Sequence, residues 1–223
     1  MGNQITKTGY TLAQDEGSSL PHRQILNFVG TGVSATDASG KTLVTIPGTI
    51  PPTTFGLFAQ TEDSIPVVNT AVETTIIGPG VGTLTVPANG FSIGDSFTCA
   101  LDGILSCGSA STLHIRVKTL TGVLLADTAI INMSATTNKP WLINLYFTIR
   151  TLGAPTVASI SSGGLFSYIR NGGVQFEGYV LSTINNTTFD TTIANTLVIT
   201  AEWDPASIGN SIVTRNFTLT KIY

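Results

Sequence analysis

The sequence has few charged residues. Asp, Glu, Lys and Arg make up 10% of its 223 residues, and the formal net charge is -3. A typical soluble domain has about 25% charged residues. A chain of this kind has no basic field for contacts with phosphate groups, so we expect no nucleic-acid partner. It also has only two cysteines, which are too few for a disulfide scaffold or a four-ligand zinc site.

Long hydrophobic runs are missing as well. The hydrophobic fraction is 42% and the mean hydropathy is +0.31. Even so, no window offers the roughly 18–20 uninterrupted apolar residues that a membrane-spanning helix needs. The first twenty residues also lack the apolar stretch of a signal peptide. We therefore expect neither a membrane span nor a signal peptide.

Threonine is abundant instead, with 36 copies beside 23 glycines and 10 prolines. Threonine is β-branched and favoured on pleated surfaces, whereas glycine and proline mark turns. From residue 72 onward the chain is a regular series of short strands. We place them at residues 74–77, 82–86, 96–101, 104–107, 113–118, 123–126, 141–150, 158–168, 174–184, 196–203 and 212–222. This all-β pattern predicts an antiparallel β-sandwich of the jelly-roll type.

Two local signals stand out within this series. Residues 113–118 alternate apolar and polar side chains without a break, which is the pattern of a half-buried strand. Asp102 and Gly103 form a two-residue hairpin signal. A hairpin with that turn points Cys99 and Cys107 to opposite faces, so we expect no disulfide between them. A three-residue loop would instead place the two cysteines directly opposite each other.

The chain divides into four segments. Residues 1–24 have no sustained apolar period, which predicts an arm that orders only on a partner. Residues 25–48 contain a strand, a Gly-x-Gly corner and a hairpin that turns at residues 37–40. So small a unit cannot bury a core alone and usually associates with copies of itself. The proline-rich residues 49–71 are interpreted as a connector, and residues 72–223 as the β-sandwich head.

Residues 26–48 carry an ordered pattern: Leu-Asn-Phe-Val-Gly-Thr-Gly-Val, an acidic turn, and then Val-Thr-Ile-Pro-Gly. This pattern resembles the short β-repeat of bacteriophage tail-fibre and related virion appendage proteins, in which such segments wind into a trimeric β-prism or shaft. In the head, residues 78–91 begin Gly-Pro-Gly-Val-Gly, residues 93–97 read Ile-Gly-Asp-Ser-Phe, and residues 186–223 end in Leu-Thr-Lys-Ile-Tyr. These segments are similar to globular heads of phage and large-virus appendage proteins. The resemblance implies a virion protein with a trimeric β-sandwich head.

The sequence holds little that could perform catalysis. It has two histidines, His22 and His114, and no Gly-x-Ser-x-Gly motif for a nucleophile. The carboxylates of the head show no spacing that pairs two of them for glycoside cleavage. No phosphate-binding loop, dinucleotide fingerprint or metal-ligand spacing is present either. We therefore expect no enzyme, no cofactor and no metal, and a glycan depolymerase is the less favoured alternative.

The densest positive patch is the polar face of the strand at 113–118. It bears His114, Arg116 and Lys118. We interpret it as the candidate face for an anionic glycan or an acidic partner. A solvated strand face is the more common explanation of such a pattern.

These observations predict a homotrimeric fibre or appendage in the virion, because closed symmetry would supply the core that residues 25–48 lack. The arm would attach to other virion proteins through its apolar residues Ile5, Tyr10, Leu12 and Leu20. The head would face outward and bind a glycan or receptor on the host surface. Because the chain is short for a tail fibre, a capsid decoration or head-fibre protein that stabilises or adorns the shell is the alternative. A cellular adhesin or lectin module is weakened by the missing signal sequence.

Overall fold

We describe a computed structural model of the chain, which places residues 14–15, 18–19, 34–37, 42–45, 56–172 and 175–223. The chain forms two compact units, Met1–Thr53 and Thr54–Tyr223. The described part of the first unit contains two antiparallel strand pairs. These are β1 (Gln14–Asp15) with β2 (Ser18–Ser19), and β3 (Ser34–Asp37) with β4 (Thr42–Thr45). The β3–β4 pair confirms the hairpin pairing predicted within residues 25–48, with Ser34 opposite Thr45.

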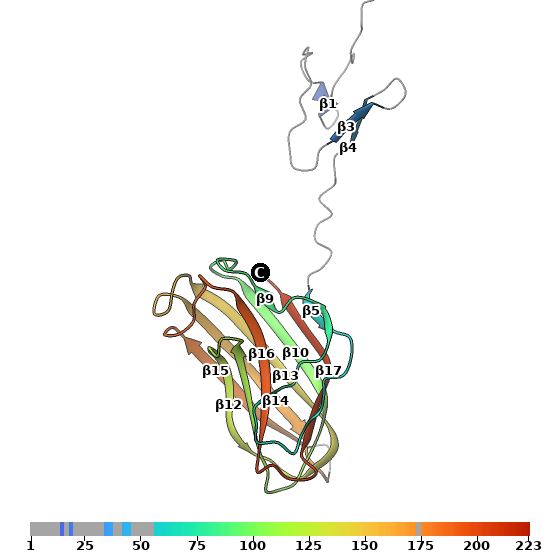
Figure 1. The fold of residues 1–223 in the computed structure, drawn as a ribbon, viewed down its shortest axis with the longest axis vertical. Helices are drawn as coiled ribbons and strands as arrows, with labels where there is room; N and C mark the ends of the chain where they lie inside the picture. The colour runs from blue at the N-terminus through green and yellow to red at the C-terminus, as the bar shows by residue number, and fades with distance from the viewer. Residues whose placement is uncertain (1–13, 16–17, 20–33, 38–41, 46–55, 173–174) are drawn as a thin grey trace, which may run out of the picture. The chain divides into compact units, whose positions relative to one another are not determined.

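The second unit is an all-β antiparallel sandwich of two sheets (Figure 1). The eight-stranded sheet contains, in spatial order, β15 (Phe176–Asn185), β14 (Ser159–Ile169), β13 (Thr136–Thr151), β10 (Ser96–Cys107), β17 (Ser211–Lys221), β5 (Gly56–Gln60) and β8 (Gly80–Gly82), with β6 (Val67–Val68) also paired to β17. The five-stranded sheet contains β12 (Leu124–Asn132), β11 (Thr112–Thr119), β16 (Asn195–Asp204) and β7 (Thr74–Thr75), with β9 (Thr85–Val86) also paired to β16. No helix among the described residues could span a membrane.

Alternation of side chains explains why these segments form strands. In β11, Leu113, Ile115 and Val117 are fully buried, and the polar residues between them are half-buried. The prediction of a half-buried strand at 113–118 is therefore confirmed. The predicted strands at 141–150 and 196–203 likewise lie within β13 and β16.

The core fills the space between the two sheets. Trp141 of β13 and Trp203 of β16 are its largest side chains, and both are almost completely buried. Each indole N–H still donates a hydrogen bond to a backbone carbonyl, from Trp141 to Val213 and from Trp203 to Val67, both at 3.2 Å. Burial of these rings therefore leaves no unpaired indole donor, which removes the main cost of placing tryptophan in a core.

The hairpin predicted at Asp102 and Gly103 is wrong. Both residues lie inside β10, which runs without interruption from Ser96 to Cys107. They mark a bulge against β17, where Asp102 lies opposite Asn216 and Gly103 lies opposite Thr214. The glycine is required by close contact, because a Cβ atom at position 103 would lie 1.9 Å from the carbonyl oxygen of Val213. The Asp-Gly pair thus accommodates a neighbouring strand and does not reverse the chain.

The cysteines are unbridged, as predicted, but for another reason. Cys99 and Cys107 are both buried and lie eight positions apart on one continuous strand. Eight residues of extended chain span roughly 26 Å, which is far beyond disulfide distance. Burial raises the pKa of both thiols, that of Cys107 to about 11. Both side chains therefore remain protonated and act as small apolar groups of the core.

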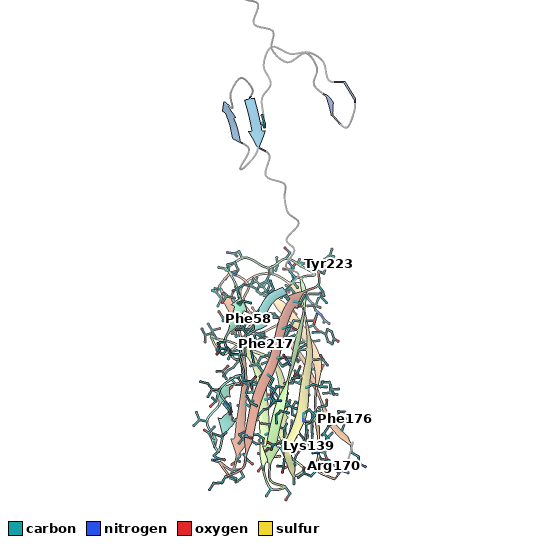
Figure 2. The ribbon with its side chains drawn as sticks, turned by 90° about the vertical axis from the view of Figure 1, so that its right-hand side faces the viewer. Phe58, Lys139, Arg170, Phe176, Phe217 and Tyr223 are labelled. Atoms are coloured by element: carbon teal, nitrogen blue, oxygen red, sulfur yellow. The ribbon has the colours of Figure 1, made fainter. Side chains whose placement is uncertain are left out.

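The sandwich includes residues that the sequence assigned to a connector at 49–71. Strand β5 pairs with β17, and so does β6. Phe58 of β5 packs beside Phe217 of β17, with ring centroids 5.3 Å apart (Figure 2). The prolines of this stretch suggested a linker, but its apolar residues complete the core of the large sheet. The head thus begins before the predicted boundary at residue 72.

Candidate functional site

The structure places His114, Arg116 and Lys118 side by side on the outer face of the five-stranded sheet, and each has an acidic partner. His114 Nε2 lies 2.6 Å from Asp127 Oδ1, and Lys118 Nζ lies 2.7 Å from Glu73 Oε1. The remaining base, Arg116, lies between two acids. Its Nη1 is 2.6 Å from Glu202 Oε2 and 3.5 Å from Glu73 Oε2. We call these six residues the β11 charge network.

Three segments of the chain supply the acids of this network. Asp127 comes from β12 and Glu202 from β16, the two hydrogen-bonded neighbours of β11, and Glu73 directly precedes β7. The sequence identified the three bases on one face but not the acids, because it did not show which strands are neighbours. A face predicted to be positive therefore also carries three acids, and all six side chains are partly exposed to solvent.

Within the network, two carboxylates approach the same base. Glu73 and Glu202 both contact Arg116. A pair that cleaves a glycoside needs one carboxyl group whose pKa is raised, so that it can act as an acid. Burial alone would raise the pKa of Glu73, but hydrogen bonds from Lys118 and Thr200 and the charges of both bases lower it overall. Glu73 is thus held ionised, as in a structural ion pair.

The eight-stranded sheet presents a different outer face. We call it the β13–β15 face, and it consists of the outward residues of three adjacent strands. They are Leu142, Asn144, Tyr146 and Thr148 of β13, Ser161, Gly163, Leu165, Ser167 and Ile169 of β14, and Phe176, Gly178, Val180, Ser182 and Ile184 of β15. Val180 is 74% exposed, Phe176 66% and Tyr146 58%. None of these residues is charged, whereas the exposed Arg150 near the end of β13 borders the face. Figure 2 shows Phe176 on the outside of the sandwich.

The one charged residue within β15 points the other way. Glu177 accepts hydrogen bonds from the hydroxyl groups of Ser134 and Tyr168, and Arg170 Nη1 lies 3.4 Å from its Oε1. Burial and the bond to Glu177 raise the pKa of Tyr168, so the phenol stays protonated and donates to the carboxylate. This cluster joins β14 and β15 to the segment before β13 and leaves the opposite face of β15 without charge.

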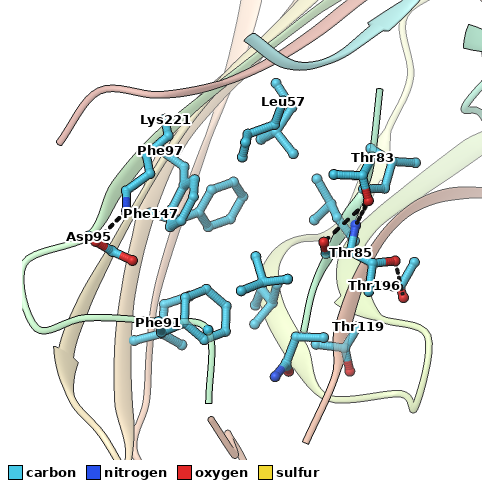
Figure 3. A pocket seen from close by; sticks show the side chains of 18 of the residues that line it. Leu57, Thr83, Thr85, Phe91, Asp95, Phe97, Thr119, Phe147, Thr196 and Lys221 are labelled. Atoms are coloured by element: carbon cyan, nitrogen blue, oxygen red, sulfur yellow. Dashed lines mark hydrogen bonds and ion pairs between the residues drawn. The ribbon is translucent and has the colours of Figure 1, made fainter. Parts of the chain in front are cut away.

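A cavity of about 270 Å³ lies between the sheets, at the end of the sandwich that holds β9 and the last residues of β17 (Figure 3). Strands of both sheets line it. Its wall is mainly apolar and includes Leu57, Leu84, Phe91, Phe97, Phe147 and Phe189. The sequence showed no sign of this cavity, because its lining residues come from segments that are far apart in the chain.

Other expected features can be placed only in part. The predicted attachment residues Ile5, Tyr10, Leu12 and Leu20 lie outside the described residues. Within the described part of the chain, no group of three or more His, Cys, Asp or Glu side chains is arranged to hold a metal ion. The expectation of no metal and no cofactor therefore stays a prediction for the whole chain.

Comparisons with known proteins were made for the whole chain. No family model, no curated protein and no solved structure matches it. The fold assignment therefore rests on the strand pairing of the sandwich, and any function must be argued from its surfaces and its cavity.

Proposed function

We propose that this chain is a structural protein of a virus particle, a homotrimeric fibre or appendage. In this proposal its N-terminal arm attaches to other virion proteins, and its β-sandwich head faces outward to bind the host surface. The jelly-roll class expected from the sequence is part of the proposal. The jelly-roll class is supported by the connections after β10, β12, β15 and β16, each of which leads from one sheet to the other. The protein acts by binding, with no catalytic step and no cofactor.

The observation that carries this proposal is the uncharged β13–β15 face. Side chains of the three strands lie beside one another across this face. For example, Asn144 of β13 lies opposite Leu165 of β14, which lies opposite Val180 of β15. A face of uncharged side chains loses less on leaving water than a charged one, and it gains the burial of its exposed apolar groups. Such a face suits contact with further copies of the same chain, and closed symmetry limits the assembly to a small number of copies.

Native mass spectrometry of the full chain tests the assembly. We expect the mass of three chains at micromolar concentration. Val180→Lys places a charge in the centre of the β13–β15 face and should convert the trimer to monomers. Val72→Lys is the matched control, because Val72 is 69% exposed and lies before β7 of the other sheet. A monomeric wild-type chain, or equal dissociation by both variants, would contradict the proposal.

The second test asks where the protein lies in the virus particle. Particles of the virus that encodes the chain should carry the protein, and an antibody against the head should label their outside. A chain that lacks residues 1–24 should form the same trimer but fail to enter particles. Labelling all over the shell would favour the capsid decoration alternative, and labelling of the tail alone would favour a tail fibre. A protein absent from purified particles would refute both.

A further inference from the structure

The cavity between the sheets is large enough for a ligand. An apolar cavity of about 150 Å³ engineered into another protein stays dry and binds benzene. The cavity of this chain holds about 270 Å³, which corresponds to two fused aromatic rings or a short alkyl chain. Side chains of native proteins normally pack closely between two sheets, so an unfilled apolar space of this size needs an explanation.

The polar groups around the cavity are already paired with one another. Asp95 Oδ1 lies 2.7 Å from Lys221 Nζ, and its Oδ2 accepts the N–H of Ser92 at 3.0 Å. The hydroxyl groups of Thr85 and Thr196 lie 2.8 Å apart. Figure 3 shows both pairs at the edges of the cavity, with the phenylalanine rings between them. These pairs leave few groups free to bind a charged or strongly polar ligand.

The apolar part of the wall is aromatic. The ring of Phe91 meets Phe97 edge to face, with centroids 6.1 Å apart, and it meets Phe189 at 5.9 Å. Phe91 is only partly buried, whereas Phe97 and Phe189 are buried. A ligand that enters would therefore lie against the faces and edges of these rings, which favour flat or apolar molecules.

The cavity is also open to solvent. Thr83, Pro87, Gly90 and Lys221 border it and are exposed. The first three belong to the segment that enters and leaves β9, and Lys221 ends β17. A small molecule can therefore enter at this end without separating the two sheets.

We propose that this cavity is a binding site for a small, uncharged, apolar molecule. The site is independent of the proposed virion function, since none of its lining residues belongs to the β13–β15 face. The probe is 1-naphthol, which has two fused rings and is fluorescent. Titration of the full chain should show saturable binding of one molecule per chain. Naphthalene-1-sulfonate, which adds a negative charge to the same rings, should bind at least tenfold more weakly.

Two matched tryptophan variants locate the site. Leu84 and Ile77 are both partly buried residues packed against the core, but only Leu84 lines the cavity. Leu84→Trp should fill the cavity and weaken 1-naphthol binding at least tenfold, whereas Ile77→Trp should change it less than twofold. Saturating 1-naphthol should raise the melting temperature of the wild-type chain and of Ile77→Trp only. No saturable binding, or equal loss in both variants, would overturn the proposal.

A cavity-enlarging variant covers the case in which Leu84→Trp does not fold. Phe91→Ala removes a partly buried ring from the wall and should admit 9-phenanthrol, which has three fused rings. Its affinity should rise at least fivefold over the wild-type chain. An unchanged or weaker affinity for 9-phenanthrol in a folded Phe91→Ala protein would also overturn the proposal.

Discussion

Replacing Gly103 by alanine should destabilise the sandwich strongly. The added Cβ would lie 1.9 Å from the carbonyl oxygen of Val213, 2.9 Å from its carbonyl carbon and 3.0 Å from Cα of Thr214. These are backbone atoms of β17, which cannot rotate away as a side chain can. The variant must therefore push β17 away from β10 at the bulge, where both strands belong to the centre of the large sheet.

The size of the effect follows from the kind of clash. Overpacking of a core by one methyl group costs about 1–3 kcal/mol, and a clash with backbone belongs at the upper end of that range. For a unit of this size, about 3 kcal/mol corresponds to a fall in melting temperature of roughly 6–12 °C. Thermal unfolding followed by circular dichroism measures this fall directly.

Two neighbouring glycines of β14 provide the controls. A Cβ at Gly163 would meet nothing closer than the carbonyl oxygen of Leu181 at 4.0 Å, whereas at Gly164 it would lie 2.2 Å from the carbonyl oxygen of Asn144. Gly163→Ala should therefore keep or raise the stability, by up to about 1 kcal/mol, because it lowers the entropy of the unfolded chain. Gly164→Ala should behave like Gly103→Ala. If Gly103→Ala melts within 2 °C of the wild-type chain, or if Gly163→Ala is equally harmful, the contact argument is refuted.

Three further predictions follow from single contacts. The pKa of Glu73 is lower in the folded chain than in the unfolded chain. The ionised carboxylate therefore stabilises the fold at pH values above the pKa of the unfolded chain, and this stabilisation is lost as the pH falls through the pKa of the folded chain. Between about pH 6 and about pH 3, the stability measured by urea unfolding should therefore fall less for Glu73→Gln than for the wild-type chain. An equal fall in both proteins would contradict this prediction. Cys99 and Cys107 are buried and protonated, so a thiol reagent should modify neither in the folded protein and both after denaturation, and rapid modification of the folded chain would exclude the fold described. Trp203→Phe removes the donor to Val67 O and should cost about 1–3 kcal/mol in denaturant unfolding, whereas an unchanged midpoint would show that this hydrogen bond contributes little.

The sequence predicts the strands of the sandwich well because their signal is local. In β11 the alternation of three buried aliphatic residues with His114, Arg116 and Lys118 is visible in six consecutive residues. In β13 the buried odd-numbered residues from Trp141 to Ile149 show the same period of two. This pattern depends only on which side of a strand faces the core, so no knowledge of the neighbouring strands is needed.

The features that the sequence missed depend on contacts between distant segments. Asp102 and Gly103 have the composition of a turn, but Gly103 is required by the passage of β17, about 110 residues later in the chain. The acids of the β11 charge network come from three different segments, and the cavity is lined by both sheets. In each case the deciding fact is strand order, which a local pattern does not contain. The residues of β13, β14 and β15 are printed in the sequence, but only the pairing shows that the outward ones form one continuous face.

The two outer faces of the sandwich differ in the free energy that association would require. Covering the β11 charge network would remove Arg116, Lys118 and their acids from water, and the desolvation penalty of such ion pairs often exceeds their mutual attraction. Covering the β13–β15 face desolvates no charge and buries Phe176 and Val180. In the homotrimer that we propose, the β13–β15 face is therefore the one between subunits. The β11 charge network then stays in contact with solvent, where its partly exposed bases and acids are available to a glycan or a receptor.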